Sequence, residues 1–229
     1  GNATAAGVYA YNGTIGNFIN SNNGTISATA NATGYSAKAY GVYADSIGNF
    51  TNNGTISATA SATGNYTYAE GIYGGSIGSF TNSGTISAIA NATGYSAWAY
   101  GVSADSINNF SNSGSILAIA NATGNYAGAW GVQTNFSIGN FTNSGNISAI
   151  ATGNYAYAAG VYAWDIGNFT NSRNISANAT GNYAWAYGVG AGSIGNFTNN
   201  GTISAIASAT GNNTEAEAAG VYADNYIDN

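Results

Sequence analysis

The chain has 229 residues, of which only 4% are charged, and its two cationic side chains stand against eight acidic ones for a net charge of −6. This balance excludes a binder of nucleic acid or of anionic membrane surfaces, since both need basic patches, and no apolar run is long enough for membrane insertion. With neither cysteine nor histidine, the chain has no disulfide and no ordinary nucleophile–base pair, so we expect no enzyme, no metal site and no other cofactor.

A repeat of 28–32 residues runs through the whole chain. Its phenylalanine returns at spacings of 32, 30, 30, 31, 28 and 28 residues, as Phe18, Phe50, Phe80, Phe110, Phe141, Phe169 and Phe197. A half coil at 1–10 precedes coils at 11–44, 45–74, 75–104, 105–134, 135–163, 164–191 and 192–223, and 224–229 resembles the start of another coil. A fixed period in this range indicates a solenoid or an array.

The copy at residues 76–104 shows what each repeat forms. Within residues 80–92, apolar or small residues alternate with hydroxyl and amide residues, and within residues 96–101 small residues alternate with bulky ones. Strict period two indicates strands rather than helices. Val102 follows Gly101 directly, which indicates a bend that resets the alternation. We therefore predict three short strands per coil, joined by corners rich in glycine and asparagine.

One coil cannot bury its inward face, whereas stacked coils can, with each strand pairing to the same strand of the next coil. We therefore expect an all-β, single-domain parallel β-helix (β-solenoid) over residues 1–229, with about seven coils and open ends. The two shorter coils each lose two residues, which preserves the inward and outward alternation. The one change of odd length lies at residues 133–137, which we place in a corner.

One column of asparagines points inward in this alternation. Side-chain amides stacked in this way can bond from coil to coil, which predicts a structural asparagine ladder. Its members are Asn52, Asn82, Asn112, Asn143, Asn171 and Asn199.

Other asparagines face outward or lie at corners, within N-x-S/T sequons. They are Asn31, Asn49, Asn53, Asn91, Asn121, Asn140, Asn168 and Asn196. Outward placement suits N-glycosylation in a host that has the machinery. Repetition of one Asn- and Thr-rich unit produces the same sequons without modification, and both interpretations stay open.

Large aromatic side chains form columns on the outer surface. The candidate contact face consists of Tyr68, Trp98, Tyr100, Trp130, Tyr157, Trp185 and Tyr187. Exposed tyrosine and tryptophan at this density are typical of a contact surface for a neighbouring subunit, a glycan or a host surface. Stacking that only stabilises the sheet is the alternative.

The motif I-x-x-F-x-N-x-G-x-I-x-A, as in Ile47–Ala58 and Ile77–Ala88, resembles the passenger regions of bacterial autotransporters and adhesin-type β-solenoids of the cell surface. The resemblance covers all seven coils and implies export and surface display, with no catalytic residues. The low charge and the close similarity of the repeats depart from that family and favour a fibre-forming relative.

We therefore expect a structural subunit of an extracellular filament, sheath or surface layer. Its partner would be itself, as a homopolymer assembled head to tail by strand pairing at the exposed coil edges. The other interpretation, that these residues are a segment of a longer β-helix, stays equally open. The alternative is a cell-surface adhesin segment whose outward Tyr and Trp face binds a glycan or a host surface. Both functions place the protein outside the cell or at its surface.

Overall fold

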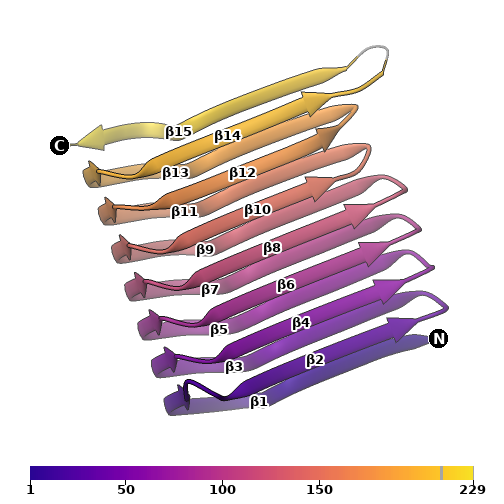
Figure 1. The fold of residues 1–229 in the computed structure, drawn as a ribbon, viewed down its shortest axis with the longest axis horizontal. Helices are drawn as coiled ribbons and strands as arrows, with labels where there is room; N and C mark the ends of the chain where they lie inside the picture. The colour runs from indigo at the N-terminus through magenta and orange to yellow at the C-terminus, as the bar shows by residue number, and fades with distance from the viewer. Residues whose placement is uncertain (212–213, 229) are drawn as a thin grey trace.

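The computed structural model describes residues 1–211 and 214–228. Two parallel sheets lie face to face and the chain passes from one to the other in every coil, which makes a parallel β-solenoid (Figure 1). Seven full coils and the long strand of an eighth are present in the described part. The predicted fold class is confirmed.

One sheet, the long sheet, contains eight strands in the order of the chain. They are β1 (Asn2–Asn20), β3 (Ser36–Asn52), β5 (Tyr66–Asn82), β7 (Ser96–Asn112), β9 (Tyr126–Asn143), β11 (Tyr155–Asn171), β13 (Tyr183–Asn199) and β15 (Glu215–Asp228). Each pairs in parallel with the strand one coil away, as Phe50 of β3 does with Phe80 of β5.

The other sheet, the short sheet, contains seven strands. They are β2 (Thr25–Ala32), β4 (Thr55–Ala62), β6 (Thr85–Ala92), β8 (Ser115–Ala122), β10 (Asn146–Thr152), β12 (Asn174–Gly181) and β14 (Thr202–Ala209). Their alternating burial follows the period-two pattern of the sequence, with Ile86, Ala88 and Ala90 turned into the core.

Each coil contains two strands rather than the three short strands predicted. The bend at Gly101 lies inside β7 and does not end it, because the backbone keeps its parallel partners on both sides of the bend. Gly101 and Val102 both face inward there. A Cβ at Gly101 would lie 2.5 Å from the carbonyl oxygen of Gly131 and 2.5 Å from Ile116, so glycine is what lets the strand turn.

The core divides into two regions along the coil. One is built from stacked alanines, which allow the two sheets to approach closely. The other contains the Ile, Val and Phe columns, in which the Phe50 and Phe80 rings stack with centroids 5.1 Å apart and the Phe80 and Phe110 rings with centroids 4.8 Å apart. Identical side chains thus repeat at the strand spacing, as expected for stacked coils.

The differences in residue number between coils preserve the alternation of inward and outward side chains, but one of them lies elsewhere than predicted. In the two shorter coils, β10 and β12 stay in register with their neighbours, so the loss of two residues preserves the inward face. The extra residue near position 135 forms a bulge within β9, between Thr134 and Ser137, and not a corner. The bulge pushes Phe136 into solvent.

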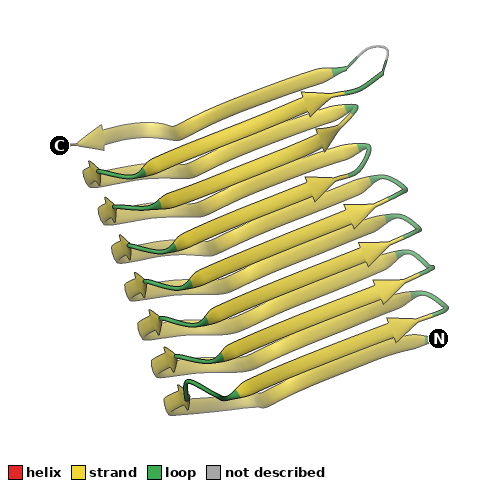
Figure 2. Cartoon of the chain, in the orientation of Figure 1, coloured by secondary structure: helices red, strands yellow, loops and turns green. Residues whose placement is uncertain are grey.

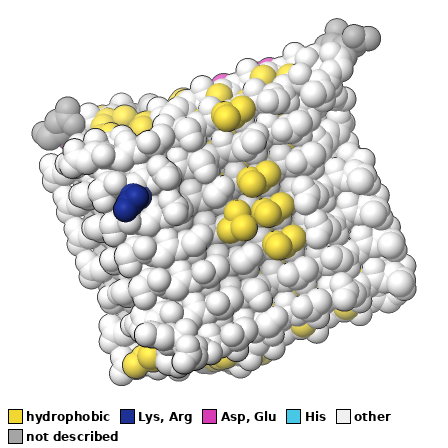
Figure 3. Space-filling model, viewed as in Figure 1, with side chains coloured by type: hydrophobic (Ala, Val, Ile, Leu, Met, Phe, Trp, Pro, Cys, Tyr) yellow, Lys and Arg dark blue, Asp and Glu magenta, His cyan; other side chains and the backbone are white. Residues whose placement is uncertain are grey.

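The connecting loops lie along two edges of the solenoid, so the side chains of the sheets form the broad faces (Figure 2). The face in Figure 3 is mostly polar, with a few apolar side chains near its centre and one cationic side chain. Solubility of this surface therefore depends on hydroxyl and amide groups more than on charge.

Candidate functional site

The inward asparagines form the predicted ladder. From Asn52 to Asn171, the Nδ2 atom of each donates to the Oδ1 atom of the asparagine in the following coil, over 2.8 Å for Asn52 to Asn82 and for Asn82 to Asn112. Each Nδ2 also donates to a carbonyl two residues on, as Asn52 does to Gly54 over 3.2 Å. Asn20, two residues after Phe18 like its counterparts, begins the ladder by donating to Asn52 and was missing from the predicted set.

The ladder amides are buried, except that Asn199 at the last full coil is exposed. A buried amide without partners costs about 1–3 kcal/mol, so each member holds its neighbours in place. All the bonds run in the same direction along the chain. The ladder therefore fixes the vertical alignment of the coils.

A second ladder lies on the outer surface and contains four of the sequon asparagines. Asn140 donates to Asn109 over 2.8 Å, Asn168 to Asn140 over 2.7 Å and Asn196 to Asn168 over 2.7 Å. Asn49 donates in the same way to Asn17. A glycan at any of these positions would need the nitrogen that bonds to the neighbouring coil.

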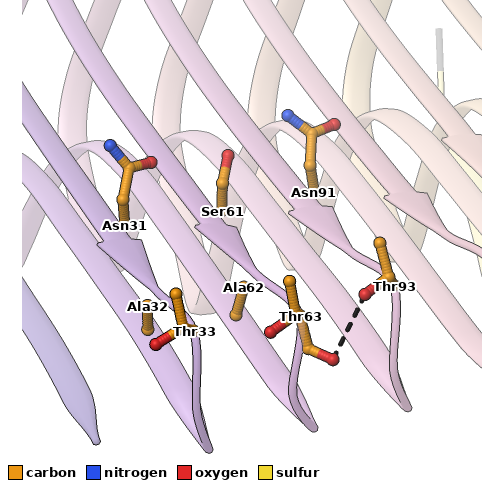
Figure 4. Close-up of a pocket in the computed structure, with 8 residues that line it drawn as sticks. All are labelled: Asn31, Ala32, Thr33, Ser61, Ala62, Thr63, Asn91 and Thr93. Atoms are coloured by element: carbon orange, nitrogen blue, oxygen red, sulfur yellow. Dashed lines mark hydrogen bonds between the residues drawn. The ribbon is translucent and has the colours of Figure 1, made fainter.

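The sequons at Asn31 and Asn91 lie outside this outer ladder. They flank Ser61 in one column, at the end of β2, β4 and β6, and their side chains project away from the stacked corner threonines (Figure 4). A shallow hollow of about 320 Å³ lies beside them. Asn121 extends this column by donating to Asn91 over 3.0 Å, and Asn53, at another corner, accepts a bond from Ser83.

The seven aromatic residues of the predicted contact face all lie on strands of the long sheet and are half-buried. Tyr100 and Trp130 stack with centroids 4.8 Å apart and planes 6° from parallel, and Trp98 stacks on Trp130 at 5.8 Å. Tyr68 leans on Tyr100 at 5.4 Å. Stacking along the sheet, which was the alternative interpretation, therefore accounts for part of this face.

Two hollows remain between these rings. One of about 420 Å³ is lined by Lys38, Tyr66, Tyr68 and Trp98, among others, and one of about 280 Å³ by Trp98, Tyr126, Tyr155, Tyr157 and Trp185 with two alanines. Aromatic walls and sparse polar groups are features of small-ligand sites. The rest of the predicted face, Tyr187, borders a smaller hollow with Tyr157.

Glu70 is the residue that sequence reasoning left out. It occupies the aromatic column between Tyr40 and Tyr100, is 1% exposed, and accepts a hydrogen bond of 2.7 Å from the hydroxyl of Tyr68. Burial raises the pKa of its carboxyl to about 8, and hydrogen bonds with Tyr68 and Ser103 offset part of that rise. Its position in a column of aromatic residues is the sequence feature that could have identified it as a buried carboxyl.

The tyrosines around Glu70 keep their protons. Burial, followed by the nearby Glu70 carboxyl, raises the pKa of Tyr40 to about 12 and raises the pKa of Tyr68 and Tyr100 further. Neutral hydroxyls remain available as hydrogen-bond donors at any physiological pH.

Both ends of the solenoid leave core columns partly open. In the central coils Val42, Ile47 and Phe50 are fully covered by the coils on either side. Their counterparts at the ends are only partly buried: Val8, Ile15, Phe18 and Ile26 at one end, and Phe197, Ile203 and Val221 at the other. The strands β1, β2, β14 and β15 each have one unpaired edge. These edges are templates for a further strand.

Other kinds of site receive no support from the described residues. No group of three or more acidic, cysteine or histidine side chains comes together within 1–211 and 214–228. No described helix has the length and hydropathy to cross a membrane.

Comparisons with protein-family profiles, curated proteins and solved structures give no match to this chain.

Proposed function

We propose that the chain is a structural subunit of an extracellular filament, sheath or surface layer that assembles by stacking coils head to tail. The observation that carries this is the continuous stacking of the coils, in which each described strand pairs in parallel with its counterpart one coil away and the same core columns run from coil to coil. A second copy of the chain that continues both sheets would extend these pairings and core columns across the joint.

The direction of the strands supports head-to-tail contact. Every strand pair in the described part is parallel, so a joint between β15 of one copy and β1 of the next continues the same pairing. A head-to-head joint would need antiparallel pairing, which would not place like residues of the two copies in the same columns. Head-to-tail contacts that do not close produce open fibres.

Charging the inner face of β1 tests the proposal. Ala3 and Ala5 pack against the alanine core from the first strand, so Ala3→Lys with Ala5→Lys is expected to block assembly while the central coils stay folded. Thr4→Lys is the matched control, because Lys38 already occupies its column in the next coil. Electron microscopy should show unbranched fibres with an axial repeat near 4.8 Å for the wild type and the control only.

Fibres of normal length from the double variant would refute the stacking model. Separate short rods from the wild-type chain would also refute self-assembly.

An adhesin segment at the cell surface is the second candidate. The observation that favours it is the pair of aromatic hollows beside Trp98, whose walls offer ring faces on which a sugar can stack. Glycan-array binding that Trp98→Ala abolishes, in a chain that remains monomeric, would favour this function over assembly.

A further inference from the structure

A gap in one tyrosine column creates a pocket on the long sheet. In the first three coils the column holds Tyr9, Tyr43 and Tyr73, whose rings stack with centroids 4.9 and 4.7 Å apart. In the seventh coil the same position is Gly190, flanked by Tyr162 and Tyr222 in the coils on either side. The missing side chain leaves a hollow of about 190 Å³.

We name this hollow the tyrosine pocket; Tyr157, Tyr162, Tyr187, Gly190, Ala191, Tyr222 and Asp224 line it. A second glycine in a ringed column behaves differently. A Cβ at Gly128 would lie 2.5 Å from Trp130 and 2.6 Å from Trp98, because these indoles have moved into the vacant space. At Gly190 the nearest atom, from the Tyr162 ring, would lie 3.0 Å away, so this ring would have to shift slightly to admit a side chain, and a hollow remains beside it.

The four rings surround the pocket at different inclinations. Tyr157 and Tyr162 meet nearly at right angles, with centroids 6.5 Å apart and planes 84° apart. Tyr187 is tilted by 49° to Tyr157 at 5.6 Å and by 43° to Tyr222 at 5.4 Å. These four tyrosines line one hollow, and the negative faces of aromatic rings attract cations.

Asp224 adds negative charge to the lining of the pocket, and Glu217 lies outside the lining but bonds to Tyr187. Tyr222 donates to Asp224 over 2.8 Å and Tyr187 donates to Glu217 over 2.8 Å, which uses the hydroxyl protons and leaves the remaining carboxylate lone pairs free to face a cation. Burial raises the pKa of Tyr157, with the charges of Glu217 and Asp224 among the further causes. The chain's own cationic side chains are elsewhere: Lys38 is in β3, and Arg173 lies in the corner after β11.

We propose that the tyrosine pocket binds a small organic ammonium ion through its four ring faces and Asp224. The size is consistent, because drug-sized ligands occupy about 300–1,000 Å³ and this hollow suits only a head group such as trimethylammonium. Anions are excluded by the carboxylates. Neutral polar ligands find few free donors, since two of the four hydroxyls already bond to acids.

Titration with choline and with tetramethylammonium, followed by isothermal calorimetry or by NMR shifts of the tyrosine rings, tests the site. The neutral isostere 3,3-dimethylbutanol has the shape of choline without its charge, and it is expected to bind at least tenfold more weakly. Asp224→Asn is expected to weaken choline binding about fivefold and to reduce its dependence on salt. Equal binding of choline and its isostere would overturn the proposal.

Gly190→Tyr fills the pocket with the residue that the column carries in other coils, so the variant is expected to fold and to lose choline binding completely. Gln133→Tyr is the matched control, since it places a tyrosine in the same column two coils away. Thermal unfolding of both variants checks that the fold is intact. Unchanged choline affinity in a folded Gly190→Tyr variant would show that the cation binds elsewhere, and the proposal would fail.

Discussion

Replacing Glu70 by glutamine is expected to stabilise the protein by an amount that grows with pH. The pKa of the Glu70 carboxyl rises from 4.5 to about 8 on folding. Between these values the folded protein holds a proton that the unfolded chain has released, so the free energy of unfolding falls as pH rises. The difference of about 3.5 between the two pKa values corresponds to about 5 kcal/mol at high pH, with about 3 kcal/mol of that already lost at pH 7.

Glutamine has the shape of glutamic acid and cannot ionise. Its Oε1 can still accept the bond that Tyr68 donates over 2.7 Å. We therefore expect the variant to exceed the wild type in free energy of unfolding by less than about 1 kcal/mol at pH 5, about 3 kcal/mol at pH 7 and about 5 kcal/mol at pH 9.

Urea unfolding followed by far-ultraviolet circular dichroism at the three pH values measures this difference. Glu215→Gln is the matched control, because it removes the same charge at an exposed position of β15. The control is expected to change the free energy of unfolding by less than about 0.5 kcal/mol at every pH. A difference between Glu70→Gln and the wild type that stays constant from pH 5 to pH 9 would show that Glu70 is ionised in the folded protein.

Three further substitution or modification experiments follow from the structure. Asn112→Ala should lower the free energy of unfolding by about 3 kcal/mol in the same urea assay, because two buried hydrogen bonds of 2.8 Å are lost. Asn109→Ala, in the outer ladder, is the control and should lower it by less than about 0.5 kcal/mol. Thr134→Val should raise it by about 1 kcal/mol, since the buried Thr134 hydroxyl has no partner among the described residues; a loss of stability would contradict this. In a host that glycosylates asparagine, glycopeptide mass spectrometry should find higher occupancy at Asn31 than at Asn168, whose nitrogen bonds to the neighbouring coil; equal occupancy would refute the reasoning.

The repeat made the solenoid predictable, because copies of one unit can only bury a common face by stacking. The inward ladder was equally accessible: Asn82 and its counterparts fall on the buried side of an alternation that tolerates no slip. The number of strands was not accessible, since Gly101 marks a bend and only the hydrogen-bond partners show that pairing continues through it.

The burial of Glu70 and the tyrosine pocket could not be predicted, because both depend on how the aromatic rings of neighbouring columns are oriented. Glu70 lies in an outward column and is covered because flanking rings lie over it, which an alternation pattern cannot express. Gly128 and Gly190 look alike in the sequence, yet two indoles close over Gly128, whereas at Gly190 the Tyr162 ring leans over the position and leaves a hollow beside it. Ring orientations therefore decide both features.

The close likeness of the coils has a kinetic consequence. Paired residues of neighbouring coils are only 28–34 positions apart, so a nucleus of two or three coils can extend by adding one neighbour at a time. The same likeness lets a strand dock one coil out of place, with a whole repeat looped out and most columns still matched. Features that occur once, such as the extra residue near Phe136, penalise such slippage, because a displaced strand cannot reproduce their local register. Irregular positions of this kind therefore favour pairing of each strand with the correct neighbouring coil during folding.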